Sequence, residues 1–151
     1  MKIAEALLLR ADIQKKLESF RERITKNVLI QEGEQPSEDP QKMLEEVNSV
    51  SEDLRSLVFK INKANLNGKT KFGRSLTEAI SERDILTTKH SIVKSAANSA
   101  TKPPERYGVK EIRWVKTVNV MQLQDDMEKL AKKIREVNSE IQEANWQIEV
   151  E

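Results

Sequence analysis

The sequence predicts a mainly α protein, a bundle of four long helices with a small β element between the third and the fourth. Two observations predict the helices: apolar residues recur in steps of three and four, and only four glycines and four prolines occur among the 151 residues. One stretch with a period of two predicts the β element, which is a strand or a hairpin. The length suits a single domain, which we place at residues 1–151.

The first half of the chain predicts two helices joined by an acidic loop. The first apolar stripe covers residues 3–24, with the steps of three and four that mark one helix face. Residues 31–40 then combine four acids with one glycine and two prolines, which predicts a flexible loop. Pro40 suits the first turn of a second helix, whose stripe covers residues 43–64 and ends before the turn signal Asn67-Gly68.

The second half predicts two further helices. Ser75 and Glu78 have the spacing of a capping box, in which each side chain binds the other residue's backbone N–H. The stripe of the third helix begins directly after Ser75 and covers residues 76–100. The fourth helix has the most regular stripe, over residues 120–148.

Between these two helices, residues 109–120 alternate between apolar and polar side chains. The even positions hold Ile112, Trp114, Val118 and Val120, with Lys116 as the exception. Such alternation predicts a strand, and a strand needs a partner. Residues 69–72 or another copy of the chain are the two candidates.

The apolar stripes are narrow, with mainly two apolar positions in each heptad. Narrow stripes favour helical hairpins and coiled coils between subunits over a thick core. We therefore expect a homo-oligomer, in which the protein's main partner is another copy of itself.

Charge is unevenly distributed, although the total is only +1. Residues 1–30 and 60–116 are basic, and residues 31–59 and 117–151 are acidic. One interpretation is that segments of opposite sign face each other within or between chains. The other is a basic patch for RNA. That patch would consist of Lys60, Lys63, Lys69, Lys71, Arg74, Lys102, Arg106 and Lys110.

Several classes of function find little support in the composition. A near-neutral chain argues against nucleic acid and membrane surfaces as partners. No apolar run approaches the ~18 residues of a membrane span, and we expect a cytoplasmic protein. The chain has no cysteine and a single histidine, His90, so we expect no metal site and no cofactor.

Three polar residues interrupt the stripes: Arg10 on the first helix, and Arg83 and His90 on the third. A charge on a buried stripe is costly unless it is paired, so partners are expected, with Asp84, Glu111, Asp126 and Glu136 as candidates. These residues either fix the register of the helices or line a polar site for an anion or small molecule. A third reading leaves them solvated. The candidate site comprises Arg83, Asp84, His90, Arg135 and Glu136.

No set of nucleophile, base and orienting residue is recognisable, so we assign no catalytic residue. Trp146 lies off the main stripe of the fourth helix and indicates a second surface or simple exposure. Trp114, Asn145 and Trp146 are the candidate interface residues.

Short motifs across most of the chain resemble a family of small bacterial helical proteins of unknown function, some of which carry the name septicolysin. The motifs are Asn65, Gly73, Ser75-Leu76-Thr77-Glu78-Ala79, Glu82-Arg83-Asp84, Glu111-Ile112, Thr117-Val118-Asn119-Val120, Leu123-Gln124, Arg135-Glu136, Ile141-Gln142 and Asn145-Trp146. The resemblance implies a helical, oligomeric, cytoplasmic protein and no particular catalytic residue.

The leading hypothesis is an oligomerisation or interaction protein without catalysis. The alternatives are an anion or small-molecule binder around Arg83 and His90, which could be an enzyme, an RNA binder that uses the basic patch, and, from the family name alone, a cytolysin.

Overall fold

The computed structural model describes residues 1–102 and 112–151 and contains four helices, as predicted. The chain divides into two compact units. Unit 1 consists of residues 1–69 and 143–151, and unit 2 of residues 70–142.

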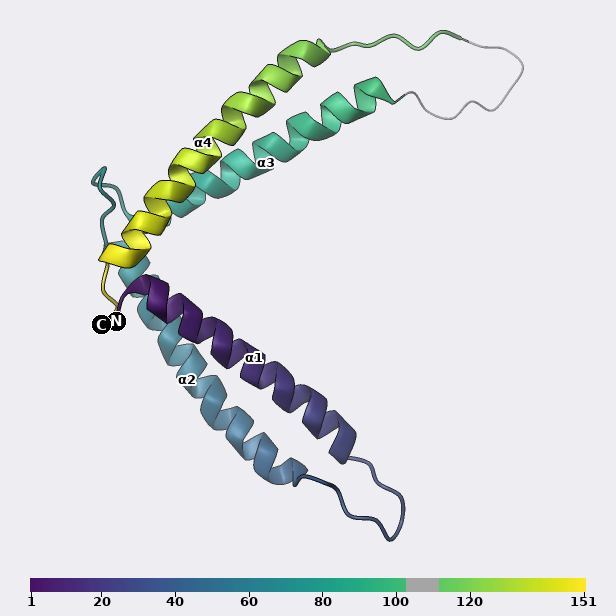
Figure 1. Ribbon diagram of the computed structural model, residues 1–151, viewed down its shortest axis with the longest axis vertical. Coiled ribbons are helices and arrows are strands. Elements are labelled where there is room, and N and C mark those ends of the chain that lie inside the picture. The colour runs from purple at the N-terminus through teal and green to yellow at the C-terminus, as the bar shows by residue number, and fades with distance from the viewer. Residues whose placement is uncertain (103–111) are drawn as a thin grey trace. The chain divides into compact units, whose positions relative to one another are not determined.

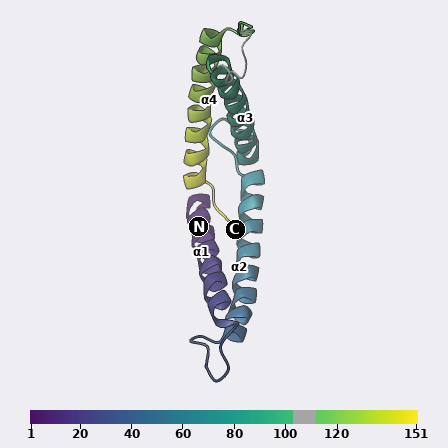
Figure 2. The same ribbon diagram turned by 90° about the vertical axis from the view of Figure 1, so that its right-hand side faces the viewer.

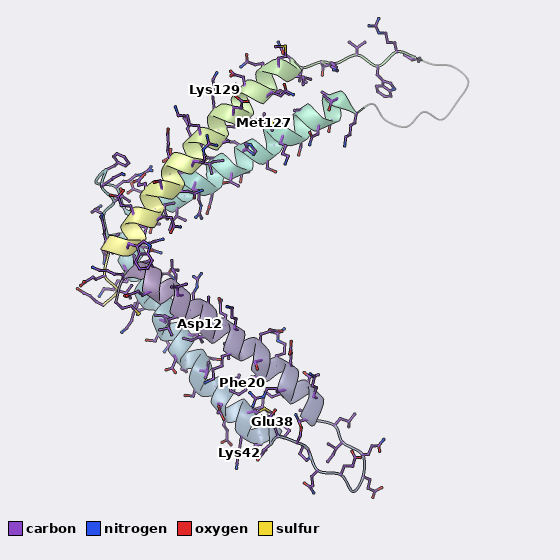
Figure 3. The ribbon with its side chains drawn as sticks, viewed as in Figure 1. Asp12, Phe20, Glu38, Lys42, Met127 and Lys129 are labelled. Atoms are coloured by element: carbon purple, nitrogen blue, oxygen red, sulfur yellow. The ribbon has the colours of Figure 1, made fainter. Side chains whose placement is uncertain are left out.

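Unit 1 is built on a pair of antiparallel helices, α1 (Ile3–Asn27) and α2 (Pro40–Asn67), which lie side by side (Figures 1 and 2). The predicted stripes form the contact between them. Its buried side chains are Ile3, Ala6 and Phe20 from α1 and Met43, Leu57 and Ile61 from α2. Phe20 lies near the end of the pair that carries the connecting loop (Figure 3). Each helix therefore buries one narrow face and leaves the rest of its surface exposed.

The loop that joins α1 to α2 is held to α1 at its second half. The Arg23 guanidinium binds the Glu38 carboxylate, with Nε 2.9 Å from Oε2. The buried Asn27 side chain accepts hydrogen bonds from the Ser37 hydroxyl (2.9 Å) and the Glu38 N–H (3.1 Å). Asp39 then caps α2, with Oδ1 accepting from the Gln41 N–H (2.9 Å).

The two ends of the chain meet in unit 1. The Ile3 N–H donates to the Ile148 carbonyl (3.0 Å), and the Val150 N–H donates to the Met1 carbonyl (2.8 Å). An ion pair of 2.9 Å between Lys2 and Glu149 flanks this short antiparallel bridge.

Gly68 lies directly after α2 and against Ile148. A Cβ atom at Gly68 would lie 2.7 Å from two Ile148 carbons and 2.8 Å from the Ala64 carbonyl oxygen. The backbone of Gly68 has a φ of −69°, so its role is to permit this close approach.

Unit 2 contains the second pair, α3 (Leu76–Thr101) with the greater part of α4 (Val120–Gln147), again side by side in both views (Figures 1 and 2). The predicted capping box is present, because the Ser75 N–H donates to Glu78 (2.7 Å) and the Glu78 N–H donates to the Ser75 hydroxyl (3.2 Å). The stripes again supply the buried side chains: Leu76, Ala79, Leu86 and Ala97 from α3, and Val137 and Ile141 from α4.

The predicted β element is wrong for the residues that the structure describes. Residues 112–119 form no strand, and Val109 and the other residues up to 111 lie outside the described part of the chain. Val120 is the first residue of α4, because Asn119 caps that helix through a hydrogen bond from the Gln122 N–H (3.1 Å). One proposed partner segment, residues 69–72, enters a tight turn in which the Thr70 N–H donates to the Arg74 carbonyl (2.9 Å).

Candidate functional site

The five residues of the predicted polar site lie on α3 and α4 of unit 2. Arg83 binds its own neighbour, with Nη2 2.7 Å from Asp84 Oδ1 and Nε 3.0 Å from the same oxygen. Asp84 is one of the partners that the sequence suggests for Arg83. This fork is thus occupied by a carboxylate from the same turn of helix.

The other three residues differ in accessibility. His90 is half-buried, and Arg135 and Glu136 are exposed. Glu136 lines a groove of about 650 Å³ together with Arg74 and Glu82, whereas Arg83 and His90 do not line it. Glu136 and the two stripe residues therefore do not line the same groove.

Arg10, the third polar interruption, lies half-buried in α1. Its Nε atom is buried and has no hydrogen-bond partner among the described residues. Of the other partners suggested for the stripe residues, Glu111 lies outside the described part of the chain.

The strongest polar cluster in unit 2 centres on Arg74, in the turn before α3. Its guanidinium binds the Glu140 carboxylate with two bonds, Nε to Oε1 at 2.9 Å and Nη2 to Oε2 at 2.5 Å. It also binds Glu82 on α3. Glu140 is only 3% exposed. One cation thereby joins the turn, α3 and α4.

This geometry determines the charge states of the cluster. The hydrogen bonds from Arg74 lower the pKa of Glu140, against the opposing effect of burial, and the Thr70 hydroxyl adds a further bond in the same direction. The same carboxylates raise the pKa of Arg74. Glu140 is therefore ionised at neutral pH and is not available as a general acid. The Arg74 fork, a member of the predicted basic patch, is already filled by carboxylates.

Sequence reasoning missed the role of Glu140, although a signal was present. Glu140 follows Val137 by three residues and precedes Ala144 by four, which is the spacing of the buried stripe. A carboxylate at such a position requires a cation close by, and no helical spacing points to Arg74, which lies 66 residues away in a turn.

The candidate interface residues differ in accessibility. Trp114 is 63% exposed, and Trp146 is also exposed, while Asn145 is buried. Trp114 lines a groove of about 510 Å³ at the end of unit 2 where α3 ends. The groove is lined by Ala96, Ser99, Ala100, Thr101 and residues 113–118.

Two further classes of site find no support in the described residues. Over 1–102 and 112–151, no three His, Asp or Glu side chains gather closely enough to hold a metal ion. None of the helices in the same ranges has the length and apolar character needed to cross a membrane.

Comparison with known proteins gives a family and a solved structure. The crystal structure of a functionally unknown conserved protein from Corynebacterium diphtheriae is similar to this chain with a TM-score of 0.90 and 30% sequence identity, over 100% of this chain and 99% of that one. No curated protein matches. Neither the family nor the structure carries the septicolysin name or an activity. A family of unknown function, DUF6847, matches residues 10–150, and the chain belongs to this family.

Proposed function

We propose that this protein is a helical interaction protein that acts by associating with further copies of itself. The observation that carries the proposal is a pair of exposed apolar side chains, one heptad apart, on one helix of each helix pair. On α2, Phe59 and Leu66 are both exposed and lie seven residues apart. On α3, Ile85 and Ile92 are likewise exposed with the same separation.

Residues seven apart lie two turns apart on one face of a helix. Phe59 follows Leu57 by two residues and precedes Ile61 by two, so at 100° per residue it lies on the opposite face of α2 from the buried contact with α1. A helix with apolar positions on two faces can pack against two neighbours. Single exposed apolar residues are common, but heptad-spaced pairs form the pattern by which helices associate.

The alternative of a ligand site around Arg83 and His90 gains no supporting observation, because Asp84 occupies the Arg83 fork. Cytolytic activity, which the septicolysin name implies, remains a prediction.

Sedimentation equilibrium over about a hundredfold range of protein concentration tests the proposal. We expect the mass to rise above the 17.3 kDa of one chain as concentration increases. The double variant Phe59→Ser/Leu66→Ser should raise the dissociation constant of self-association at least about tenfold, because it removes two apolar side chains from the contact.

Leu8→Ser is the matched control for Leu66→Ser. Leu8 on α1 has the same exposure as Leu66, 63%, but the residue one heptad further along is Lys15. This control should associate like the unchanged protein. A mass of one chain at every concentration would refute self-association.

A further inference from the structure

The free ends of the two helix pairs carry opposite charges and exposed apolar side chains. We define the acidic tip as residues 26–46 of unit 1, which include the loop between α1 and α2. We define the basic tip as the described residues 94–102 and 112–118 of unit 2, which follow α3 and precede α4. Both tips lie at the ends of their helix pairs (Figure 1).

The acidic tip holds six acids and two bases. Glu38 binds Arg23, and Asp39 caps α2, so these two have internal roles. Glu32 and Glu34 are exposed in the loop. Directly before them, Val28, Leu29 and Ile30 are exposed as well, Leu29 to 86%. The tip thus presents three consecutive aliphatic side chains next to two exposed carboxylates.

The basic tip has the complementary composition. It holds Lys94, Lys102, Arg113 and Lys116 and no acidic residue. Arg113 and Lys116 are exposed and line the groove of about 510 Å³ together with Trp114, Val115 and Val118. Val115 is 75% exposed. The groove therefore offers apolar side chains and two cations in its lining.

We infer that the acidic tip of one copy docks on the basic tip of a second copy. This inference rests on the proposed self-association and names the surfaces that take part. Val28, Leu29 and Ile30 would cover the groove beside Trp114, while Glu32 and Glu34 would face Arg113 and Lys116. The charges fix which tip meets which, because two tips of the same kind repel each other.

Each copy contributes one acidic and one basic tip, so a dimer in which both contacts form leaves no tip without a partner. Each unit also carries one exposed heptad-spaced pair, Phe59 and Leu66 on unit 1 and Ile85 and Ile92 on unit 2. In such a dimer, unit 1 of one copy pairs with unit 2 of the other.

Charge reversal tests the inference. The acid variant, Glu32→Lys/Glu34→Lys, and the base variant, Arg113→Glu/Lys116→Glu, each place like charges in both contacts of a dimer. We expect each to raise the dissociation constant of the dimer more than tenfold, measured by sedimentation at ~50 mM salt, where screening is weak.

Mixing the two variants is the decisive step. In the mixed dimer, the lysines of the acid variant meet the glutamates of the base variant, and the unchanged tips meet each other. Both contacts are attractive again, so the mixture should recover the association that each variant lacks. Recovery on mixing identifies a contact between two chains, whereas a contact within one chain gives no recovery.

Matched controls have the same change in net charge at exposed positions away from the tips. Asp53→Lys/Glu128→Lys matches the acid variant, and Lys15→Glu/Lys132→Glu matches the base variant. Both controls should associate like the unchanged protein.

The possible failures are distinct. If the unchanged protein is a monomer throughout, the proposed function fails, and this inference fails with it. If it associates and the tip variants associate equally well, only the docking of the tips is refuted. No recovery on mixing refutes it as well. A monomer that binds a single-stranded RNA oligonucleotide through Arg113 and Lys116 would overturn it in favour of nucleic acid.

Discussion

Glu140 is one of the two carboxylates that bind the Arg74 guanidinium, which joins three segments of unit 2. The Glu140 carboxylate is buried on α4, and Glu82 of α3 binds the same guanidinium. A buried ion pair adds little relative to a well-packed apolar pair, but removal of one partner leaves the other charge without compensation. The cluster therefore mainly favours one conformation of the turn between residues 70 and 74.

We predict that Glu140→Gln lowers the free energy of unfolding by about 2–3 kcal/mol at pH 7, because the variant keeps the shape of the side chain but loses the charge that Arg74 binds. Urea denaturation followed by circular dichroism measures the change. Glu128→Gln, at an exposed position of α4 away from the cluster, is the control and should change stability by less than about 0.5 kcal/mol.

The same prediction has a pH dependence of known sign. Arg74 lowers the pKa of Glu140 in the folded state, below the ordinary value of 4.5. The stabilisation is therefore fully present above about pH 4.5 and is lost as the pH falls through the folded-state pKa. The difference between the protein and the Gln variant should shrink below that pH. A difference that stayed constant into acid would show that the charge of Glu140 is not what stabilises the cluster.

At the scale of the helices, the junction after α2 depends on a residue without a side chain. Gly68→Ala would place a methyl group 2.8 Å from the Ala64 carbonyl oxygen and 2.7 Å from Ile148 carbons. We expect a loss of about 1–3 kcal/mol, because overpacking forces side chains or backbone to move.

The companion variant Ile148→Ala separates the two clashes. In the double variant, the clash with residue 148 is relieved, so the combined loss should be smaller than the sum of the single losses. Additive losses in thermal denaturation would place the strain at the Ala64 carbonyl alone.

The helices could be predicted from the sequence because their information is local. The capping box at Ser75, proline at the start of α2 and the three-four spacing all act within a few residues, and each agrees with the buried stripe. The strand prediction was wrong because it rested on the local alternation of apolar and polar residues alone. Residues 112–118 alternate as a strand would, but a strand exists only with a partner, and Asn119 directs the following residues into a helix.

The contacts of the candidate site were harder to predict, because contacts between residues far apart in the sequence leave no local pattern. The pairing of Arg83 with Asp84 is a local event, and Asp84 was among the expected partners. The link between Arg74 and Glu140 joins residues 66 positions apart, and no periodicity connects a turn to a helix. Charge on a stripe shows that a partner is needed but does not say where it is.

At the scale of the whole molecule, the narrow buried stripes explain why many apolar side chains remain exposed on the surface of a single copy. Each helix pair leaves apolar side chains exposed along one helix and at its tip. The two tips carry charges of opposite sign. Each unit can be stable through its own buried stripe, while burial of the remaining apolar side chains requires a second copy. This is the physical basis for the self-association proposed above.

The bridge between residues 1–3 and 148–150 has a consequence for engineering the chain. Because the two ends are hydrogen-bonded to each other, a short glycine-serine linker can join them, and new ends can be opened elsewhere. We expect a circular permutant cut between Gly33 and Glu34 to keep the helical circular dichroism spectrum and to melt within a few degrees of the original. A permutant that failed to fold would show that α1 and α2 need their direct covalent connection, and a folded one would turn the loop into a site for attaching fluorescent labels or affinity tags.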